Sequence, residues 1–91
     1  MDDIAQRVQQ IVAEQVGMDI AAITLDKRLD LDLGCDSLDD IEIVMALEDE
    51  FRIALPDEEC GSVRTVDQAV QLVRQHLQRQ QGTSTPDPTG I

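Results

Sequence analysis

The chain has 91 residues and a formal net charge of −12 at pH 7, from 19 Asp and Glu against seven Lys and Arg. This length allows one small domain, and the negative charge argues against a protein that binds nucleic-acid phosphates or anionic lipid through a basic patch. No apolar run approaches the roughly 18 residues of a membrane span, and the acidic N-terminus lacks the layout of a signal peptide, so we expect a soluble, cytoplasmic monomer.

The first predicted helix covers residues 3–16, where apolar residues recur at helical intervals. Asp2 or Asp3 can cap its start, and Gly17 suits the left-handed residue that follows a helix. Residues 18–35 have no helical period beyond a short turn near 19–23. Leucines at nearly alternate positions there would suit a strand, but no second strand is predicted to pair with it. We therefore expect a long functional loop that is fastened to the core by its leucines, which are Leu25, Leu29, Leu31 and Leu33.

The second helix is predicted from Ser37 to Phe51, with Asp36 as its N-cap. Asp39 and Asp40 fall in its first turn, where carboxylates complement the helix dipole. A short helix follows between Pro56 and Gly61, since proline suits the start of a helix and glycine its end.

The last helix begins with a capping-box pattern, in which Thr65 is the cap and Gln68 follows three residues later. Its apolar stripe consists of Val66, Ala69, Val70, Leu72, Val73 and Leu77. Residues 79–91 have too few apolar groups to offset the entropy of ordering, so we expect a disordered tail after a folded domain over residues 1–78. The predicted fold is all-α, a small bundle of three main helices and one short helix.

The apolar residues of the second helix separate into two sets on a helical wheel. The broad set suits a core and comprises Ile43, Val44, Leu47 and Phe51. A bundle helix buries one face only, so the opposite set should lie in solvent, and it comprises Leu38, Ile41 and Met45. Twelve acids and one base, Arg52, lie between residues 30 and 59. An apolar strip with an acidic rim indicates a docking surface for basic partners, and the alternative is an ordinary solvated surface.

Ser37 is predicted to be the first residue of the second helix. The free backbone N–H groups and positive dipole at that end favour an anion, so its hydroxyl is suited to carrying a phosphoryl group. A serine that merely helps the cap is the alternative. A hydrolase nucleophile would need a base beside it, whereas the only histidine, His76, is predicted near the exposed end of the last helix.

No metal site is predicted. The aspartates from Asp30 onward resemble the first ligands of an EF-hand, but position six is Cys35 rather than Gly and position twelve is Ile41 rather than Glu. The two cysteines, Cys35 and Cys60, also lack the paired spacing of a zinc site, and we interpret them as small, half-buried, reduced residues.

The stretch Asp32-Leu33-Gly34-Cys35-Asp36-Ser37-Leu38-Asp39, with residues 41–51 and 53–59 after it, resembles an acyl carrier protein. The resemblance extends over residues 3–78. It implies that a separate phosphopantetheinyl transferase (holo-acyl-carrier-protein synthase) attaches 4′-phosphopantetheine from coenzyme A to Ser37. It also implies that the chain has no catalytic residues, because the thiol at the end of this arm carries acyl chains as thioesters, and that the acyl group is sheltered among the helices.

The resemblance further implies that partner enzymes recognise the second helix. Asp36 would be recognised by the transferase in addition to capping the helix. The other implied partner contacts are Leu38, Asp39, Ile41, Glu42, Met45, Glu48 and Asp49. Leu29 and Leu31 depart from the family pattern, which has Phe and Glu there, and Cys35 stands where Ala is common.

We expect a stand-alone carrier that presents acyl chains to fatty-acid synthase enzymes and acyltransferases. The alternatives are a specialised carrier for polyketide or special-lipid synthesis and, from another class, an acidic interaction module without a prosthetic group.

Overall fold

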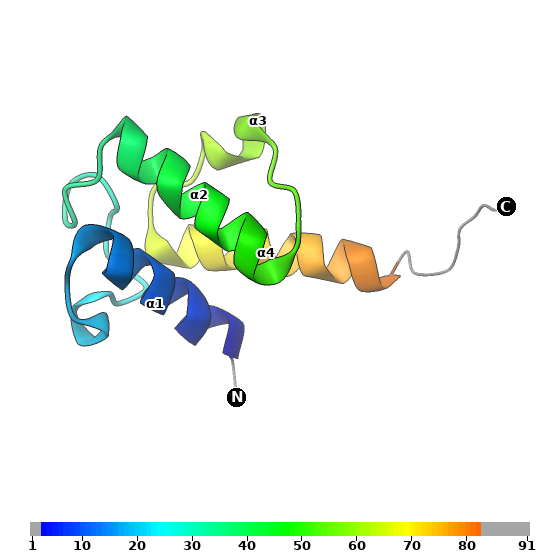
Figure 1. Cartoon of the computed structure of the whole chain (residues 1–91), viewed down its shortest axis with the longest axis horizontal. Helices are drawn as coiled ribbons and strands as arrows, with labels where there is room; N and C mark the ends of the chain where they lie inside the picture. Colours follow the sequence, from blue (N-terminus) through cyan, green and yellow to red (C-terminus); the bar gives the residue numbers. More distant parts are fainter. Residues whose placement is uncertain (1–2, 83–91) are drawn as a thin grey trace, which may run out of the picture.

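The computed structural model describes residues 3–82, and for residues 79–82 it describes the backbone alone. The chain forms four α-helices and one 3₁₀ turn in the order α1 (Asp3–Val16), η1 (Ile20–Ala22), α2 (Ser37–Phe51), α3 (Asp57–Cys60) and α4 (Val66–Gly82). No strand occurs within residues 3–82, so the all-α prediction is confirmed. Helix α1 packs against both α2 and α4, and α3 packs on α4 (Figure 1).

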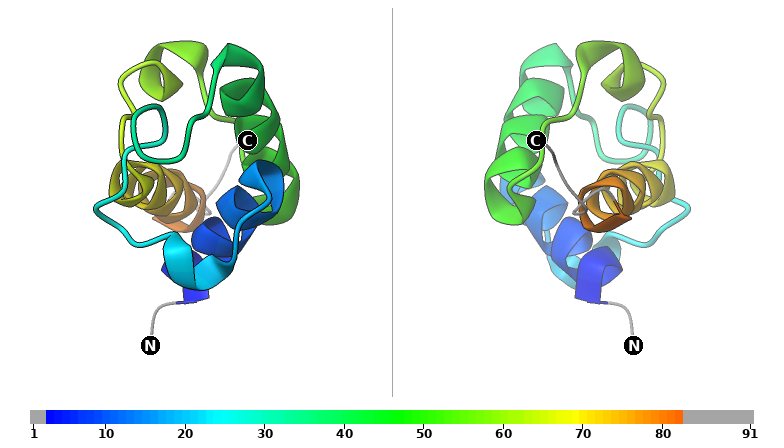
Figure 2. Two further views of the ribbon diagram at one scale, coloured as in Figure 1. Left: turned by 90° about the vertical axis from the view of Figure 1, so that its left-hand side faces the viewer. Right: turned by 90° about the vertical axis from the view of Figure 1, so that its right-hand side faces the viewer.

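The core is aliphatic, and most of its buried side chains come from the three long helices, whose ribbons Figure 2 shows from both ends. Each helix buries one stripe, because its apolar residues recur every three or four positions. The fully buried side chains are Val8, Val12, Ile23, Val66, Val70 and Val73. Gly17 has a φ of +73°, so the predicted left-handed end of α1 is confirmed.

The loop between α1 and α2 differs from the prediction in the role of its leucines. Leu29 is buried and Leu33 is half-buried, but Leu25 is 39% exposed and Leu31 is 73% exposed, so two of the four do not fasten the loop. The loop is held instead by backbone hydrogen bonds to the segment that enters α4. Arg28 and Thr65 form an isolated antiparallel bridge, in which the N–H of Leu29 donates to the carbonyl of Arg64 at 2.9 Å.

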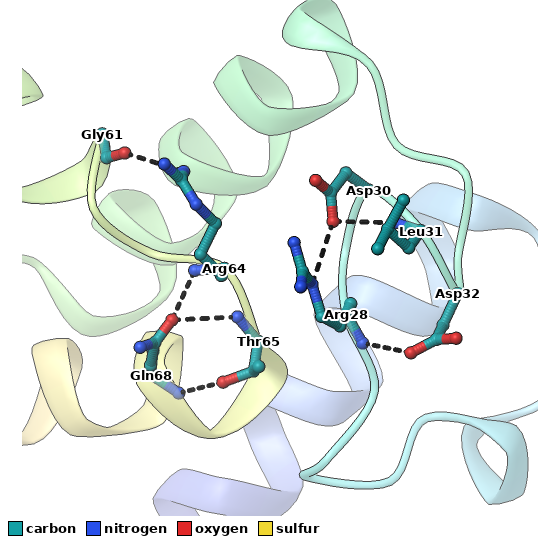
Figure 3. A network of polar contacts seen from close by, with 8 residues as sticks. All are labelled: Arg28, Asp30, Leu31, Asp32, Gly61, Arg64, Thr65 and Gln68. Atoms are coloured by element: carbon teal, nitrogen blue, oxygen red, sulfur yellow. Dashed lines mark hydrogen bonds and ion pairs between the residues drawn. The ribbon is translucent and has the colours of Figure 1, made fainter.

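The predicted starts of α3 and α4 are confirmed. Pro56 is the N-cap of α3 and Gly61 its C-cap. At the start of α4 the Thr65 hydroxyl accepts from the N–H of Gln68 at 3.1 Å, and the Gln68 side chain accepts from the N–H of Thr65 at 3.1 Å (Figure 3).

Helix α4 continues to Gly82, four residues beyond its expected end at Gln78. Residues 79–82 of the predicted disordered tail are therefore helical. The rest of that tail, residues 83–91, lies outside the described residues, as does the proposed cap Asp2.

Candidate functional site

The start of α2 is held by a reciprocal pair of hydrogen bonds. Asp36 has an extended backbone, and its carboxylate accepts from the N–H of Asp39 at 2.9 Å. The carboxylate of Asp39 accepts in turn from the N–H of Asp36 at 3.2 Å. This capping box confirms Asp36 as the N-cap and gives Asp39 a structural role as well. Just before it, Gly34 has a φ of +72°, a conformation that glycine adopts without strain.

Ser37 is the first residue of α2 and is exposed, as the sequence predicts. Its position directly after the cap places it in the first helical turn, where the leading N–H groups have no acceptor within the helix. Those groups and the positive end of a helix of 15 residues stabilise an anion there. The site is therefore electrostatically suited to a phosphodiester, in spite of the acidic side chains around it.

His76 is not placed as a base for Ser37. Its side chain is only 11% exposed, and its Nε2 lies 2.7 Å from a carboxylate oxygen of Glu59. The contact joins α4 to α3. Among residues 3–82 no group of three or more His, Cys, Asp or Glu side chains is arranged to hold a metal ion.

The second apolar face of α2 lies in solvent, as predicted. Leu38 and Met45 are each 61% exposed and Ile41 is 55% exposed. Glu42 and Asp49 are exposed beside them. These five residues form one surface that combines apolar side chains with carboxylates.

Three acids that the resemblance assigns to the contact surface also make contacts within the fold. Glu48 is half-buried and accepts from the backbone N–H of Leu55 at 2.8 Å, which fixes the chain after α2. The amide of Gln15 on α1 donates to Glu42 and lies 3.4 Å from a carboxylate oxygen of Asp39. Gln15 carries no sequence signal for this contact, since the pairing depends on how α1 packs on α2.

Comparison with known proteins agrees with this geometry. Residues 6–81 match the family described as "Phosphopantetheine attachment site". The fold is similar to the crystal structure of an acyl carrier protein from Thermotoga maritima, with a TM-score of 0.70 and 32% identity over 80% of this chain and 85% of that one. The chain belongs to the acyl carrier protein family.

A second similar structure is the apo doublet acyl carrier protein from prodigiosin biosynthesis. The TM-score is again 0.70, with 25% identity over 80% of this chain and 35% of that longer one. Acyl carrier proteins have no catalytic activity of their own, and the group that they bear is 4′-phosphopantetheine. No helix in the described part of this carrier is both long and apolar enough to cross a membrane.

A small cavity in the carrier lies between α2, α3 and α4. Its volume is about 40 Å³ and its lining is mostly apolar: Leu29, Asp40, Ile43, Val44, Leu47, Leu55, Cys60, Val63, Ala69 and Leu72. A water molecule needs about 10–15 Å³ of such a cavity, so this one has room for only a few water-sized groups. Because protein interiors are close-packed, a longer acyl chain requires the surrounding helices to separate.

The cavity adjoins a surface groove of about 340 Å³ between α2 and α3. Val44, Leu55 and Cys60 line both spaces. Ile41 and Met45 line the groove. The exposed face of α2 is thus continuous with the apolar interior.

Burial and neighbouring carboxylates control the titration of groups near Ser37. The pKa of the Cys35 thiol is raised to about 11, mainly by burial and also by the negative charges of Asp40 and Asp39. The predicted half-buried Cys35 is in fact buried, at 8% exposure. Since thiolates are the nucleophilic form, burial and the raised pKa make Cys35 less reactive at neutral pH than an exposed cysteine.

Proposed function

We propose that Ser37 is the residue that bears the 4′-phosphopantetheine arm. The observation that supports this most directly is the exposed serine at the first position of α2, because the N-terminal end of a helix stabilises a phosphodiester. The capping box of Asp36 and Asp39 holds this turn rigid, so the hydroxyl is presented to a transferase without rearrangement. The arm supplies the thiol on which acyl groups are held as thioesters.

The cavity between α2, α3 and α4 is proposed as the shelter for the acyl chain. Its wall is apolar, and the adjoining groove gives access from the surface near Ile41 and Met45. The short helix α3 forms one side of the cavity and is tied to α4 by the Glu59–His76 contact. Movement of α3 would enlarge the cavity at a smaller loss of packing than movement of the long helices, because α3 has only four residues.

The exposed face of α2 is proposed as the docking surface for partner enzymes, with Leu38, Ile41 and Met45 as apolar contacts. Glu42 and Asp49, with Asp36, Asp39 and Glu48, supply negative charge around them. Opposite charges on the partner speed encounter, and burial of the apolar centre holds the complex. The partners are the phosphopantetheinyl transferase and the synthases and acyltransferases that act on the arm.

The pathway proposed is fatty-acid synthesis in the cytoplasm. The family pattern over Asp36-Ser37-Leu38-Asp39 supports it, together with an aliphatic interior suited to unbranched acyl chains. A specialised role in polyketide or special-lipid synthesis is the second candidate, favoured by the similarity to a carrier from prodigiosin biosynthesis and by the unusual Leu31.

One mass measurement tests the attachment site. The full chain is incubated with coenzyme A and a broad-specificity phosphopantetheinyl transferase, and intact masses are recorded for wild type and Ser37→Ala. We expect one added phosphopantetheine on wild type and none on the variant. Modification of the variant, or none of wild type, would refute the assignment. Loading by fatty-acid or polyketide enzymes then distinguishes the two pathways.

Paired variants test the docking surface. Glu42→Lys and Met45→Ala change this face, and Glu14→Lys and Met18→Ala make the same changes at exposed positions outside α2. We expect kcat/KM for a partner enzyme to fall about fivefold or more in each of the first two variants and to stay unchanged in the controls. Equal effects in both pairs would place the interface elsewhere.

A further inference from the structure

A tight turn over residues 28–33 precedes α2 and is held by its own hydrogen bonds. The carbonyl of Arg28 accepts from the N–H groups of Asp32 and Leu33, both at 3.0 Å, and the N–H of Arg28 donates to the Asp32 carboxylate at 2.8 Å. The Asp30 carboxylate accepts from the N–H of Leu31 at 2.7 Å and lies 3.5 Å from Nε of Arg28 (Figure 3). Each bond removes freedom from the turn.

The rest of the fold fixes where this turn lies. The N–H of Leu29 donates to the carbonyl of Arg64, and the N–H of Cys35 donates to the carbonyl of Leu29 at 2.8 Å. The first bond ties the turn to the segment that enters α4, and the second ties it to the residue just before the α2 cap. The turn therefore lies at the end of the molecule where α2 begins, as both Figure 1 and Figure 2 show.

Leu31 is presented to solvent by this turn. At 73% it is the most exposed of the large apolar side chains in the described residues, whereas its neighbours Leu29 and Leu33 turn inward. Single exposed leucines are common on protein surfaces. Leu31 differs because its backbone is held in place and because exposed acids, Asp30 and Asp32, stand on both sides of it. This is the composition of the exposed face of α2, repeated on the loop beside it.

We propose that this turn is part of the contact surface for the phosphopantetheinyl transferase, with Leu31 as its apolar contact. The inference rests on the proposed attachment at Ser37. Among the partners, the transferase alone must bring its catalytic groups to the Ser37 hydroxyl itself, whereas enzymes that act at the far end of the arm can sit further away.

The size of a protein interface favours the same partner. A stable interface of standard size covers roughly 20–30 residues on each side, and α2 has 15 residues with one side buried. An enzyme centred on the first residue of α2 must therefore cover neighbouring structure. The 28–33 turn is the adjoining segment on the loop side, and its charge has the sign that suits the basic partner surface proposed for α2.

The test compares two leucines of the same loop. Leu31→Gln removes the proposed contact, and Leu25→Gln is the control, since Leu25 is 39% exposed and its segment lies against α4, where its carbonyl accepts from the N–H of Asp67 at 2.9 Å. Transfer from coenzyme A to the full chain is followed by intact mass over a range of carrier concentrations. We expect the KM for the carrier to rise about fivefold in Leu31→Gln, with kcat unchanged. The KM of Leu25→Gln should stay near the wild-type value, and Leu31→Met should restore the wild-type KM.

The remaining outcomes separate the occupants of this surface. Equal KM values in Leu31→Gln and Leu25→Gln would overturn the proposal. A defect confined to synthase turnover of the holo carrier would assign Leu31 to a synthase instead, and a wild-type dimer that Leu31→Gln dissociates in sedimentation would assign it to a second copy of this chain. Failure of wild type to accept phosphopantetheine would refute the proposed function itself, a result distinct from all of these. Thermal unfolding of each variant checks that the fold is intact.

Discussion

The capping box at Asp36 allows the hydrogen bond and the charge of one carboxylate to be separated. Asp36→Ala removes the acceptor for the N–H of Asp39, a bond of 2.9 Å, while Asp36→Asn keeps an acceptor oxygen and removes only the charge. Loss of an N-cap acceptor costs about 1 kcal/mol of stability. Loss of the charge weakens the favourable interaction with the helix dipole but relieves repulsion from nearby acids such as Asp40, so these two effects oppose each other.

We therefore expect Asp36→Ala to lower the free energy of unfolding by about 1 kcal/mol, and Asp36→Asn to change it by less than about 0.5 kcal/mol. For a domain of this size the first value corresponds to a fall in Tm of about 4–8 °C. Urea unfolding followed by helical circular dichroism measures both variants, and equal m-values show that the unfolded states are comparable.

The same two variants also separate stability from recognition. If the transferase recognises the negative charge of Asp36, both variants raise the KM of the transferase for the carrier, although only Asp36→Ala is destabilised. Equal destabilisation of the two variants would show that the charge of Asp36, rather than its hydrogen bond, stabilises α2. That result would refute the assignment of the stabilisation to the capping hydrogen bond.

Three further predictions concern titration near the site. The pKa of Cys35 rises from 9.0 to about 11 in the fold, mainly through burial, so the protonated thiol stabilises the protein fully below pH 9, and this contribution is lost as the pH rises from 9 through 11. In a Cys60→Ala background, the free energy of unfolding should therefore decrease over that pH range. Adding Cys35→Ala should make this decrease smaller. Native alkylation of Cys35 at pH 8 should also be about 100-fold slower than in urea, and equal rates would contradict its burial. The pKa of Asp40 is raised by burial and by the charges of Asp39, Asp30 and Asp36, so its ionised form destabilises the fold. Asp40→Asn should therefore raise the urea midpoint of unfolding at pH 7 and raise it less at pH 4. A larger increase at pH 4 than at pH 7 would show that the ionised carboxylate stabilises the fold instead.

Local sequence patterns determined the helices and their ends. The spacing of apolar residues predicts α1, α2 and α4, and the caps at Asp36 and Thr65 place the starts of α2 and α4 to the residue, while Pro56 places the start of α3 to within one residue. These features depend on side chains within one turn of each other, so they are readable without the fold. The exposed strip on α2 was predictable for the same reason, since a helical wheel requires no knowledge of what covers the opposite face.

The tertiary structure decided the features that no local sequence pattern encodes. Which loop leucines are buried depends on the bridge between Arg28 and Thr65, and the contact of His76 with Glu59 depends on the position of α3. The cavity beneath the groove is likewise a product of three helices that meet from distant parts of the chain. In each case the partners are far apart in sequence, and their contacts form only when the long helices pack, so a pattern read along the chain has no means of pairing them.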